Sequence, residues 1–208
     1  MQNGTKKRKN GIDTYQRILK ISSELFARNG FDGVSVYDIA KGCGIGESSL
    51  YNHFKSKTEI LDHLFEYYMR EIPLSRPSDA ELKERLDTMS PEELLMQILL
   101  SASPKISGLL ADTAMIINKE KYRNPKAADL YYRYVVEEPT RFYEKLFTEM
   151  KQRGKIADID VRAFAEQYHY VCMTLTKEYY MMQNGFTNMQ ALMGKFYKTI
   201  HFFCGLMK

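Results

Sequence analysis

The sequence has no tryptophan, only three cysteines in 208 residues, and no long apolar run. Cys43, Cys172 and Cys204 are scattered and lack ligand spacing, so we expect neither a disulfide framework nor a metal site. Without 18 consecutive apolar residues no membrane-spanning helix is expected, and no apolar segment follows the basic N-terminus as in a secretory signal. These absences predict a cytoplasmic protein with reduced thiols. Cys204 has two interpretations, a buried spectator or a redox sensor.

Catalytic patterns are also missing. The four histidines are dispersed, and the chain has no H-E-x-x-H helix, no phosphate-binding loop and no nucleophile elbow. We therefore expect no enzymatic activity, no catalytic residues, no cofactor and no metal.

Charge is unevenly distributed along the chain. Residues 1–60 hold ten Lys/Arg and six Asp/Glu, a net +4, and residues 61–208 hold 20 of each, a net of zero. Four of the early positive charges stand in a row at Lys6–Lys9, which leaves residues 11–60 neutral. The segment 1–10 is predicted to be a flexible basic arm. Such an arm either contacts nucleic-acid phosphates or is a solvated terminus without a role.

The apolar pattern is helical throughout, so the chain is predicted to be all-α. One helix is expected over residues 14–29, and another begins near Thr58 and ends before Pro73. Ser90 with Glu93 forms a capping box with proline at the first helical position. A long helix from residue 125 to about 153 is expected to be bent at Pro139, which lacks an N–H.

Residues 31–57, FDGVSVYDIAKGCGIGESSLYNHFKSK, predict a helix-turn-helix. Ser35 is the expected N-cap of the first helix, and Asp38 lies in its first turn. Gly42 and Gly44 permit the positive φ that ends that helix. The second helix is expected over residues 47–54, with Leu50 and Phe54 facing inward.

Residues 11–61, about a quarter of the chain, resemble the DNA-binding domain of TetR-family (tetracycline-repressor-like) transcriptional regulators. The resemblance rests on TYQRILKISSELFARNG, the FDGVS link, D-I-A, G-I-G, and the L-Y-N-H-F block that is followed by S-K-T-E-I-L. It implies an all-α fold with an N-terminal three-helix helix-turn-helix domain and a larger helical domain for ligand binding and dimerisation. The expected divisions are 1–10 for the arm, 11–57 for the DNA-binding domain, 58–77 for a connecting helix and hinge, and 78–208 for the second domain.

The resemblance also implies DNA-contact residues. Tyr51 and His53 would donate to phosphate oxygens, and Lys57 would meet a phosphate beside a helix N-terminus. Base readout is open among Ser48, Ser49 and Asn52. The expected DNA-binding set is Ser35, Gly46, Glu47, Ser48, Ser49, Tyr51, Asn52, His53 and Lys57.

The recognition helix departs from the family pattern at its start. Gly46 stands where the family usually has Ser or Thr, and Glu47 and Ser48 replace small and basic or neutral residues. Glu47 would either accept a hydrogen bond from a cytosine amine or repel phosphate.

The last two predicted helices, 161–183 and 188–204, carry apolar residues on more than one face. They are interpreted either as a homodimer interface, which the family resemblance implies, or as a larger intramolecular core. The expected interface residues are Phe164, Tyr168, Val171, Leu175, Leu192, Phe196, Ile200 and Phe203.

The second domain is rich in aromatic residues and methionine, and the resemblance implies that it binds an unknown small-molecule effector. A pocket competes here with an ordinary helical core. Its expected lining is Tyr122, Tyr131, Tyr134, Phe142, Tyr143, Tyr168, His169 and Met173.

The leading hypothesis is a homodimeric, sequence-specific repressor that binds double-stranded operator DNA and is released by its effector. The alternative is a protein-binding co-regulator on the same fold with weak or no specific DNA binding. The effector, the operator sequence, the target genes and the sign of regulation lie beyond the sequence.

Overall fold

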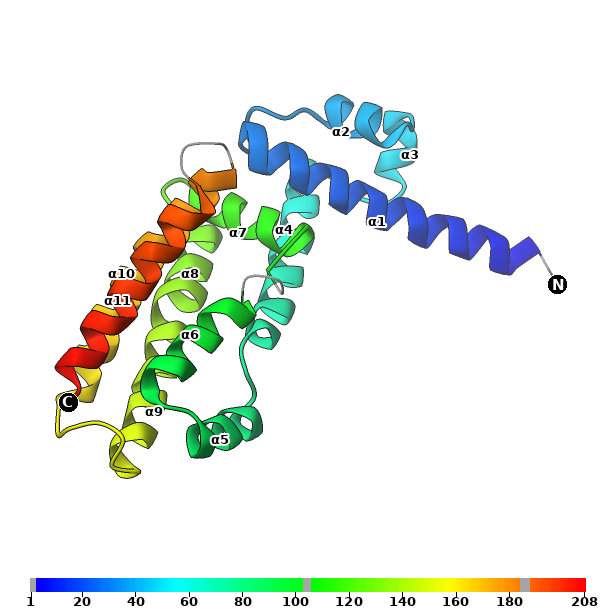
Figure 1. Cartoon of the computed structure of the whole chain (residues 1–208). Coiled ribbons are helices and arrows are strands. Elements are labelled where there is room, and N and C mark those ends of the chain that lie inside the picture. Colours follow the sequence, from blue (N-terminus) through cyan, green and yellow to red (C-terminus); the bar gives the residue numbers. More distant parts are fainter. Residues whose placement is uncertain (1–2, 103–105, 184–187) are drawn as a thin grey trace. The chain divides into compact units, whose positions relative to one another are not determined.

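The computed structural model describes residues 3–102, 106–183 and 188–208. All regular elements in these ranges are helices, which confirms the all-α prediction (Figure 1). Within the same ranges, no helix is both long and apolar enough to cross a lipid bilayer.

The chain folds into two compact units that are not contiguous in sequence. The first comprises Met1–Ser75 and Ile106–Tyr131, and the second comprises Arg76–Lys105 and Tyr132–Lys208. The first unit contains α1 (Asn3–Asn29), α2 (Val36–Cys43), α3 (Glu47–Tyr51), α4 (Lys57–Glu71), the 3₁₀ turn η1 (Ile72–Ser75), α7 (Leu109–Glu120) and α8 (Pro125–Tyr131). The second contains α5 (Asp79–Thr88), α6 (Pro91–Ala102), the π-helix η2 (Tyr132–Glu137), α9 (Glu138–Gln152), α10 (Val161–Gln183) and α11 (Met189–Leu206).

The first unit is built around α1, which packs against α2, α4 and α7. Apolar residues recur at helical spacing along α1 and α4, so each helix turns an apolar face towards the core of this unit. The residues that are at most 2% exposed include Ile18, Phe26, Val34, Ile39, Leu50, Phe54, Ile60, Leu64, Phe65, Ile116 and Ile117. This core holds α2 and α3 in place, so the polar surface of α3 stands on a rigid base.

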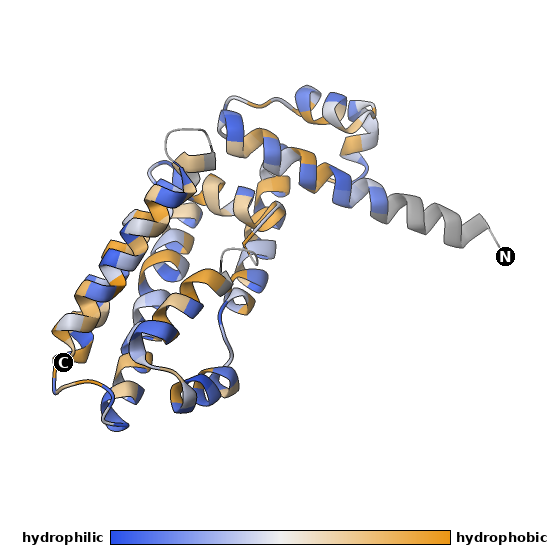
Figure 2. Cartoon of the chain, in the orientation of Figure 1, coloured by the Kyte–Doolittle hydropathy of each residue, from blue (hydrophilic) through white to orange (hydrophobic). Residues whose placement is uncertain are grey.

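The second unit encloses one large apolar cluster contributed by α5, α6, α9, α10 and α11. Figure 2 shows that its helices carry both apolar and polar residues along their length, as partly exposed helices do. Aromatic rings dominate the centre: Tyr168 and Phe203 meet edge to face at 5.2 Å, and Phe147 meets Phe164 at 5.1 Å. Such edge-to-face contacts are a favoured arrangement of aromatic pairs.

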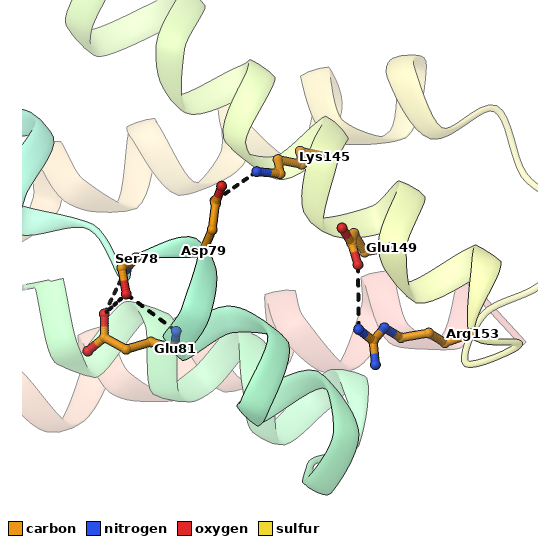
Figure 3. A network of polar contacts seen from close by, with 6 residues as sticks. All are labelled: Ser78, Asp79, Glu81, Lys145, Glu149 and Arg153. Carbon is orange, nitrogen blue, oxygen red and sulfur yellow. Dashed lines mark hydrogen bonds and ion pairs between the residues drawn. The ribbon is translucent and has the colours of Figure 1, made fainter.

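Ion pairs join α5 to α9 on the outside of this cluster (Figure 3). Ser78 forms a capping box with Glu81 at the start of α5, and Asp79 accepts from Lys145 of α9 at 2.7 Å. Arg153, the residue that follows α9, pairs with Glu149 at 3.6 Å and also with Asp87. Since most of these side chains are exposed, the pairs fix orientation more than they stabilise the fold.

The predicted capping box at the start of α6 is confirmed, and two further caps also form between neighbouring residues. Glu93 and Ser90 form a capping box before α6. Gly154 ends α9 with a φ of +66°, and the Asn188 side chain accepts from the Ala191 N–H at the start of α11.

Three features differ from the sequence-based expectation. The helix predicted from residue 14 begins at Asn3, so the segment expected to be a disordered arm is helical from Asn3. The helix α5 was missed, because its short apolar pattern follows a polar stretch interpreted as a boundary. The helical run from residue 125, which was expected to bend at Pro139, contains a π-helix just before that residue, and this change of helix type was not predicted.

Candidate nucleic-acid interface

The turn between α2 and α3 is built from local signals. Ser35 accepts from the Asp38 N–H at 3.1 Å, and the Asp38 carboxylate accepts from the Ser35 N–H at 2.9 Å. The Ser35 hydroxyl also donates to this carboxylate, and this hydrogen bond together with the one from the Ser35 N–H lowers the pKa of Asp38. Gly44 then ends α2 with a φ of +66°, and the Ile45 N–H donates to the Ala40 carbonyl. The predicted N-cap and the predicted glycine turn are both confirmed.

Close packing of α2 on α1 also depends on a glycine. A Cβ at Gly42 would lie 2.8 Å from Cγ2 of Ile21, which is closer than such atoms approach. The absence of a side chain at Gly42 therefore lets α2 approach α1 and sets where the turn emerges.

The helix α3 is short, and its sides differ sharply in exposure. It spans Glu47–Tyr51 and continues as a turn through residue 53, whereas a helix to Phe54 was expected. Leu50 and Phe54 are buried, as predicted, and Phe54 stacks on Tyr15 of α1 at 5.0 Å. The predicted contact residues of α3 and its turn remain accessible: Glu47, Ser48, Tyr51 and Asn52 are exposed, and Ser49 and His53 are half-buried.

The N-terminus of α3 explains one role of Glu47. Gly46 is the N-cap and provides no side-chain hydrogen bond to the first-turn N–H groups. Glu47 is the acidic residue of that first turn, where a carboxylate interacts favourably with the helix dipole. Thus Glu47 has a structural role in addition to the two DNA-related interpretations.

The link between α1 and α2 is held by charged side chains from two other helices. Lys57 of α4 donates to the carbonyl oxygens of Phe31 at 2.8 Å and Val34 at 2.7 Å, and its Nζ lies 4.3 Å from the centre of the Phe31 ring. Lys119 of α7 donates to the Ala27 carbonyl at 2.5 Å.

Glu120, which is buried next to Lys119, completes this arrangement. Its carboxylate accepts from the Phe31 N–H at 3.1 Å. We call Lys57, Lys119 and Glu120 the link clamp. Two of the three N–H donors of Lys57 are used on backbone carbonyls, so its placement favours a positioning role over the free phosphate contact expected from sequence. The other two clamp residues lie about 60 positions further along the chain, and no local pattern indicated them.

Sequence analysis also missed exposed residues beside the turn. Tyr37 on α2 is 58% exposed, and the Lys41 ammonium lies 6.0 Å from its ring centre. Lys41 and Lys55 are exposed on either side of α3 in sequence. An exposed tyrosine two residues after the N-cap was a signal that could have been noticed.

This geometry agrees with the comparison to known protein families. The family model described as "Bacterial regulatory proteins, tetR family" matches residues 18–64, which include α2, the glycine turn and α3. Residues 18–64 thus carry a TetR-family helix-turn-helix segment. The helical architecture of the chain is shared with the ketosteroid transcriptional regulator KstR2 of Mycobacterium tuberculosis (TM-score 0.63, 20% identity, 93% of this chain and 94% of that chain).

Two curated relatives extend the comparison. The chain is 39% identical over 80 residues to the HTH-type transcriptional regulator YerO of Bacillus subtilis, which covers 38% of this chain and 27% of YerO. It is 29% identical over 117 residues to the nucleoid occlusion factor SlmA of Vibrio cholerae, covering 54% of this chain and 59% of SlmA. The chain thus spans about a quarter of YerO and little more than half of SlmA.

The expected effector-site residues are divided between the two units. Phe142, Tyr143, Tyr168 and His169 are brought together in the second unit, where Tyr143 lies 4.9 Å from Tyr168 and 6.1 Å from His169 between ring centres. Tyr134 and Met173 are half-buried in the same unit. Burial raises the pKa of both phenols in this cluster and lowers the pKa of His169. The cluster therefore presents neutral hydrogen-bonding groups.

Tyr122 and Tyr131 belong to the first unit instead. Tyr122 is 84% exposed, and the Lys121 ammonium lies 4.6 Å and 4.5 Å from the centres of the Tyr122 and Tyr131 rings. The physical reason is that α7 and α8 pack on α1 and α4, a non-local pairing that composition does not reveal.

A cavity that was not expected lies within the first unit. It has a volume of about 480 Å³ and is formed by α1, α4 and the start of α7. Asp112 lines it and accepts from Ser23 at 3.1 Å, and burial together with the nearby Glu24 raises the Asp112 pKa. The full lining is Tyr15, Gln16, Leu19, Lys20, Glu24, His63, Glu66, Tyr67, Arg70, Gly108, Leu109 and Asp112.

Most of the expected dimer residues are buried within the protomer itself. Tyr168, Leu175, Leu192, Phe196, Ile200 and Phe203 are each at most 6% exposed, and Phe164 packs on Phe203 at 5.3 Å. Only Val171 of the expected set is exposed, at 37%. The regular apolar stripe faces the core of the second unit, as in the alternative interpretation. The exposed apolar residues of α10 and α11 are Tyr170, Val171, Met181, Met189, Tyr197, Phe202 and Leu206.

The cysteines carry free thiols. Cys204 is buried, and its surroundings raise the pKa of the thiol to about 11, chiefly through burial. Because the thiolate is the reactive form, this environment favours a spectator over a redox sensor.

Proposed function

We propose that the chain is a sequence-specific DNA-binding transcriptional regulator. The observation that carries the proposal is the capped α2, the Gly44 turn and the exposed polar face of α3, all within the segment matched by the TetR family model. In such a motif, the second helix enters the DNA major groove. Ser48 and Asn52 supply side chains for base edges, and Tyr51 and His53 supply donors for phosphates.

The regulator acts as a homodimer through α10 and α11. A helix-turn-helix dimer reads two half-sites, so its operator is a two-fold repeat. The surface proposed for the interface is the exposed apolar set Tyr170, Val171, Met181, Met189, Tyr197, Phe202 and Leu206. These residues replace the buried stripe as interface candidates, because only exposed side chains are available to a second copy.

A small molecule releases the protein from its operator. The effector binds beside the aromatic cluster of Phe142, Tyr143, Tyr168 and His169, whose neutral phenol and imidazole groups suit an uncharged, largely apolar ligand. The cavity in the first unit is a second candidate position, supported by a volume within the range of ligand pockets. Thermal shifts with a panel of neutral aromatic compounds separate the two. A shift lost in Tyr143→Ala supports the cluster, and one lost in Leu109→Trp supports the cavity.

A second function, a co-regulator with weak or no specific DNA binding that recruits a partner protein, is favoured by the charge of the helix-turn-helix. Residues 11–60 carry no net charge, and Glu47 is exposed at the start of α3. The relative SlmA is described as a nucleoid occlusion factor.

The deciding experiment is fluorescence anisotropy of the full chain on DNA that flanks its own gene. A scrambled duplex serves as control, at two salt concentrations. Specific binding with a steep salt dependence supports the regulator, and equal weak binding to both duplexes supports the co-regulator.

A further inference from the structure

The carbonyl of Val135 lacks its usual helical partner. In an α-helix, this oxygen accepts the N–H of the residue four positions later. That residue is Pro139, which has no N–H, so an α-helical backbone would leave the Val135 oxygen without a donor. A buried carbonyl without a partner is costly, and the protein must supply another donor.

His169 of α10 supplies that donor. Its Nε2 lies 2.7 Å from the Val135 oxygen, and the imidazole is buried. Because a carbonyl oxygen only accepts, Nε2 carries the hydrogen. The next carbonyl along the chain, that of Val136, accepts from the Thr140 hydroxyl at 2.7 Å. Side chains therefore hold two successive carbonyls in the region where the helical backbone changes form.

The surroundings of His169 lower the pKa of its imidazole. Tyr143 and Tyr170 lie 6.1 Å and 6.4 Å away between ring centres, and Cys172 is three residues further along α10. Burial lowers the His169 pKa most, the hydrogen bond to the Val135 carbonyl opposes this shift, and the charge of Arg76 lowers the pKa further. Arg76 is paired with Glu138 of α9 at 3.5 Å. The imidazole thus acts here as a single neutral donor.

The backbone around Val135 is a π-helix, η2, over Tyr132–Glu137. π-helices are rare and usually occur as single turns that take up an extra residue within an α-helix. Conversion to an α-helical backbone would keep every residue and would replace the i→i+5 hydrogen bonds of this turn with i→i+4 hydrogen bonds. The element that precedes η2 in the chain is α8, the last element of the first unit.

We propose that η2 is a two-state switch between a π-helical and an α-helical backbone, and that His169 holds the π-helical state through the Val135 carbonyl. Pro139 disfavours the α-helical state because it cannot donate to that carbonyl. A change in the surroundings of His169 moves this balance. The effect of the switch on DNA binding rests on the proposed function, whereas the switch itself does not.

Amide hydrogen exchange on the full-length protein tests the switch, with peptides that cover residues 130–141. His169→Leu removes the donor. The amide exchange rate of this segment should rise by about fivefold, which corresponds to the loss of one hydrogen bond. His169→Gln is the matched control, since its amide retains a donor, and should restore most of the protection. Pro139→Ala provides the missing N–H and should slow exchange at residues 136–140.

The double variant is decisive. In the Pro139→Ala background the carbonyl has a backbone donor, so His169→Leu should raise exchange by less than twofold. The proposal is overturned if His169→Leu raises exchange equally in both backgrounds. It is also overturned if exchange in Pro139→Ala is the same as in the wild type. The Pro139→Ala measurement remains informative even if His169→Leu does not fold. Operator affinity of Pro139→Ala should change while the salt dependence stays constant. If wild-type protein binds no operator, the regulator proposal fails, and the exchange result still decides the switch.

Discussion

Replacing Lys57 with methionine separates positioning of the helix-turn-helix from contact with DNA. Methionine retains the apolar stem over Phe31 and removes the ammonium that holds the Phe31 and Val34 carbonyls. A hydrogen bond to a charged donor contributes about 1.5–3 kcal/mol, and the contact with the Phe31 ring about 0.5–1 kcal/mol. Because Lys57 is half-exposed, water replaces part of this stabilisation in the variant. We therefore expect the free energy of unfolding to fall by about 1–2 kcal/mol.

The assay combines thermal unfolding with operator titrations at several salt concentrations. A loss of this size lowers the midpoint of unfolding by roughly 4–15 °C for a unit of about 100 residues. Operator affinity should fall, because the α1–α2 link is no longer held. The slope of log affinity against log salt should stay constant, since two of the three donors are already used within the protein.

Lys55→Met is the matched control two residues away. Lys55 is exposed, so its loss should leave the unfolding midpoint unchanged and reduce the salt slope by about 0.9 if it meets a phosphate. The positioning argument is refuted if Lys57→Met reduces the slope as Lys55→Met does while its unfolding midpoint stays at the wild-type value.

Three further predictions concern other parts of the molecule. Glu47→Ala should reduce discrimination at one operator base pair by about 1–3 kcal/mol if Glu47 reads cytosine, whereas uniformly tighter binding to operator and scrambled DNA would reject that reading. Phe202→Asp, at a side chain 61% exposed, should turn a dimer into a folded monomer in sedimentation, and a wild-type monomer would remove the interface. Folding lowers the pKa of His169, so the unfolded chain takes up the proton first as the pH falls. The free energy of unfolding should therefore decline below about pH 6.5 until the pH passes the folded pKa, and it should decline less steeply in His169→Gln. Equal pH profiles of the wild type and His169→Gln would contradict this prediction.

Features that depend on neighbouring residues could be predicted from the sequence. Ser35 and Asp38 are three residues apart, and Gly44 needs only its own backbone to adopt a positive φ, so the caps and the turn were recognised. The L-Y-N-H-F block likewise placed Leu50 and Phe54 inside and the residues between them at the surface.

Features that depend on packing between distant segments could not be predicted. Periodicity identified an apolar stripe on α10 and α11, but it could not tell whether Phe196 faces its own core or a second copy. The link clamp joins Phe31 to residues on α4 and α7, and its lysines look like ordinary surface charges in the sequence. The effector-site expectation grouped Tyr122 with Tyr143 by composition, although they fold into different units.

The assignment of Ile106–Tyr131 to the first unit limits how this protein can be divided or recombined. A fragment that ends at Ser75 would lack α7 and α8, and would expose the apolar surface of α1 and α4 that Leu110, Ile116, Ile117, Ala127 and Leu130 help to cover. It would also lose Lys119 and Glu120 from the α1–α2 link. Exchange of regulatory domains between relatives, in evolution or in the laboratory, therefore has to leave these two helices with the DNA-reading part and make its junctions on either side of them.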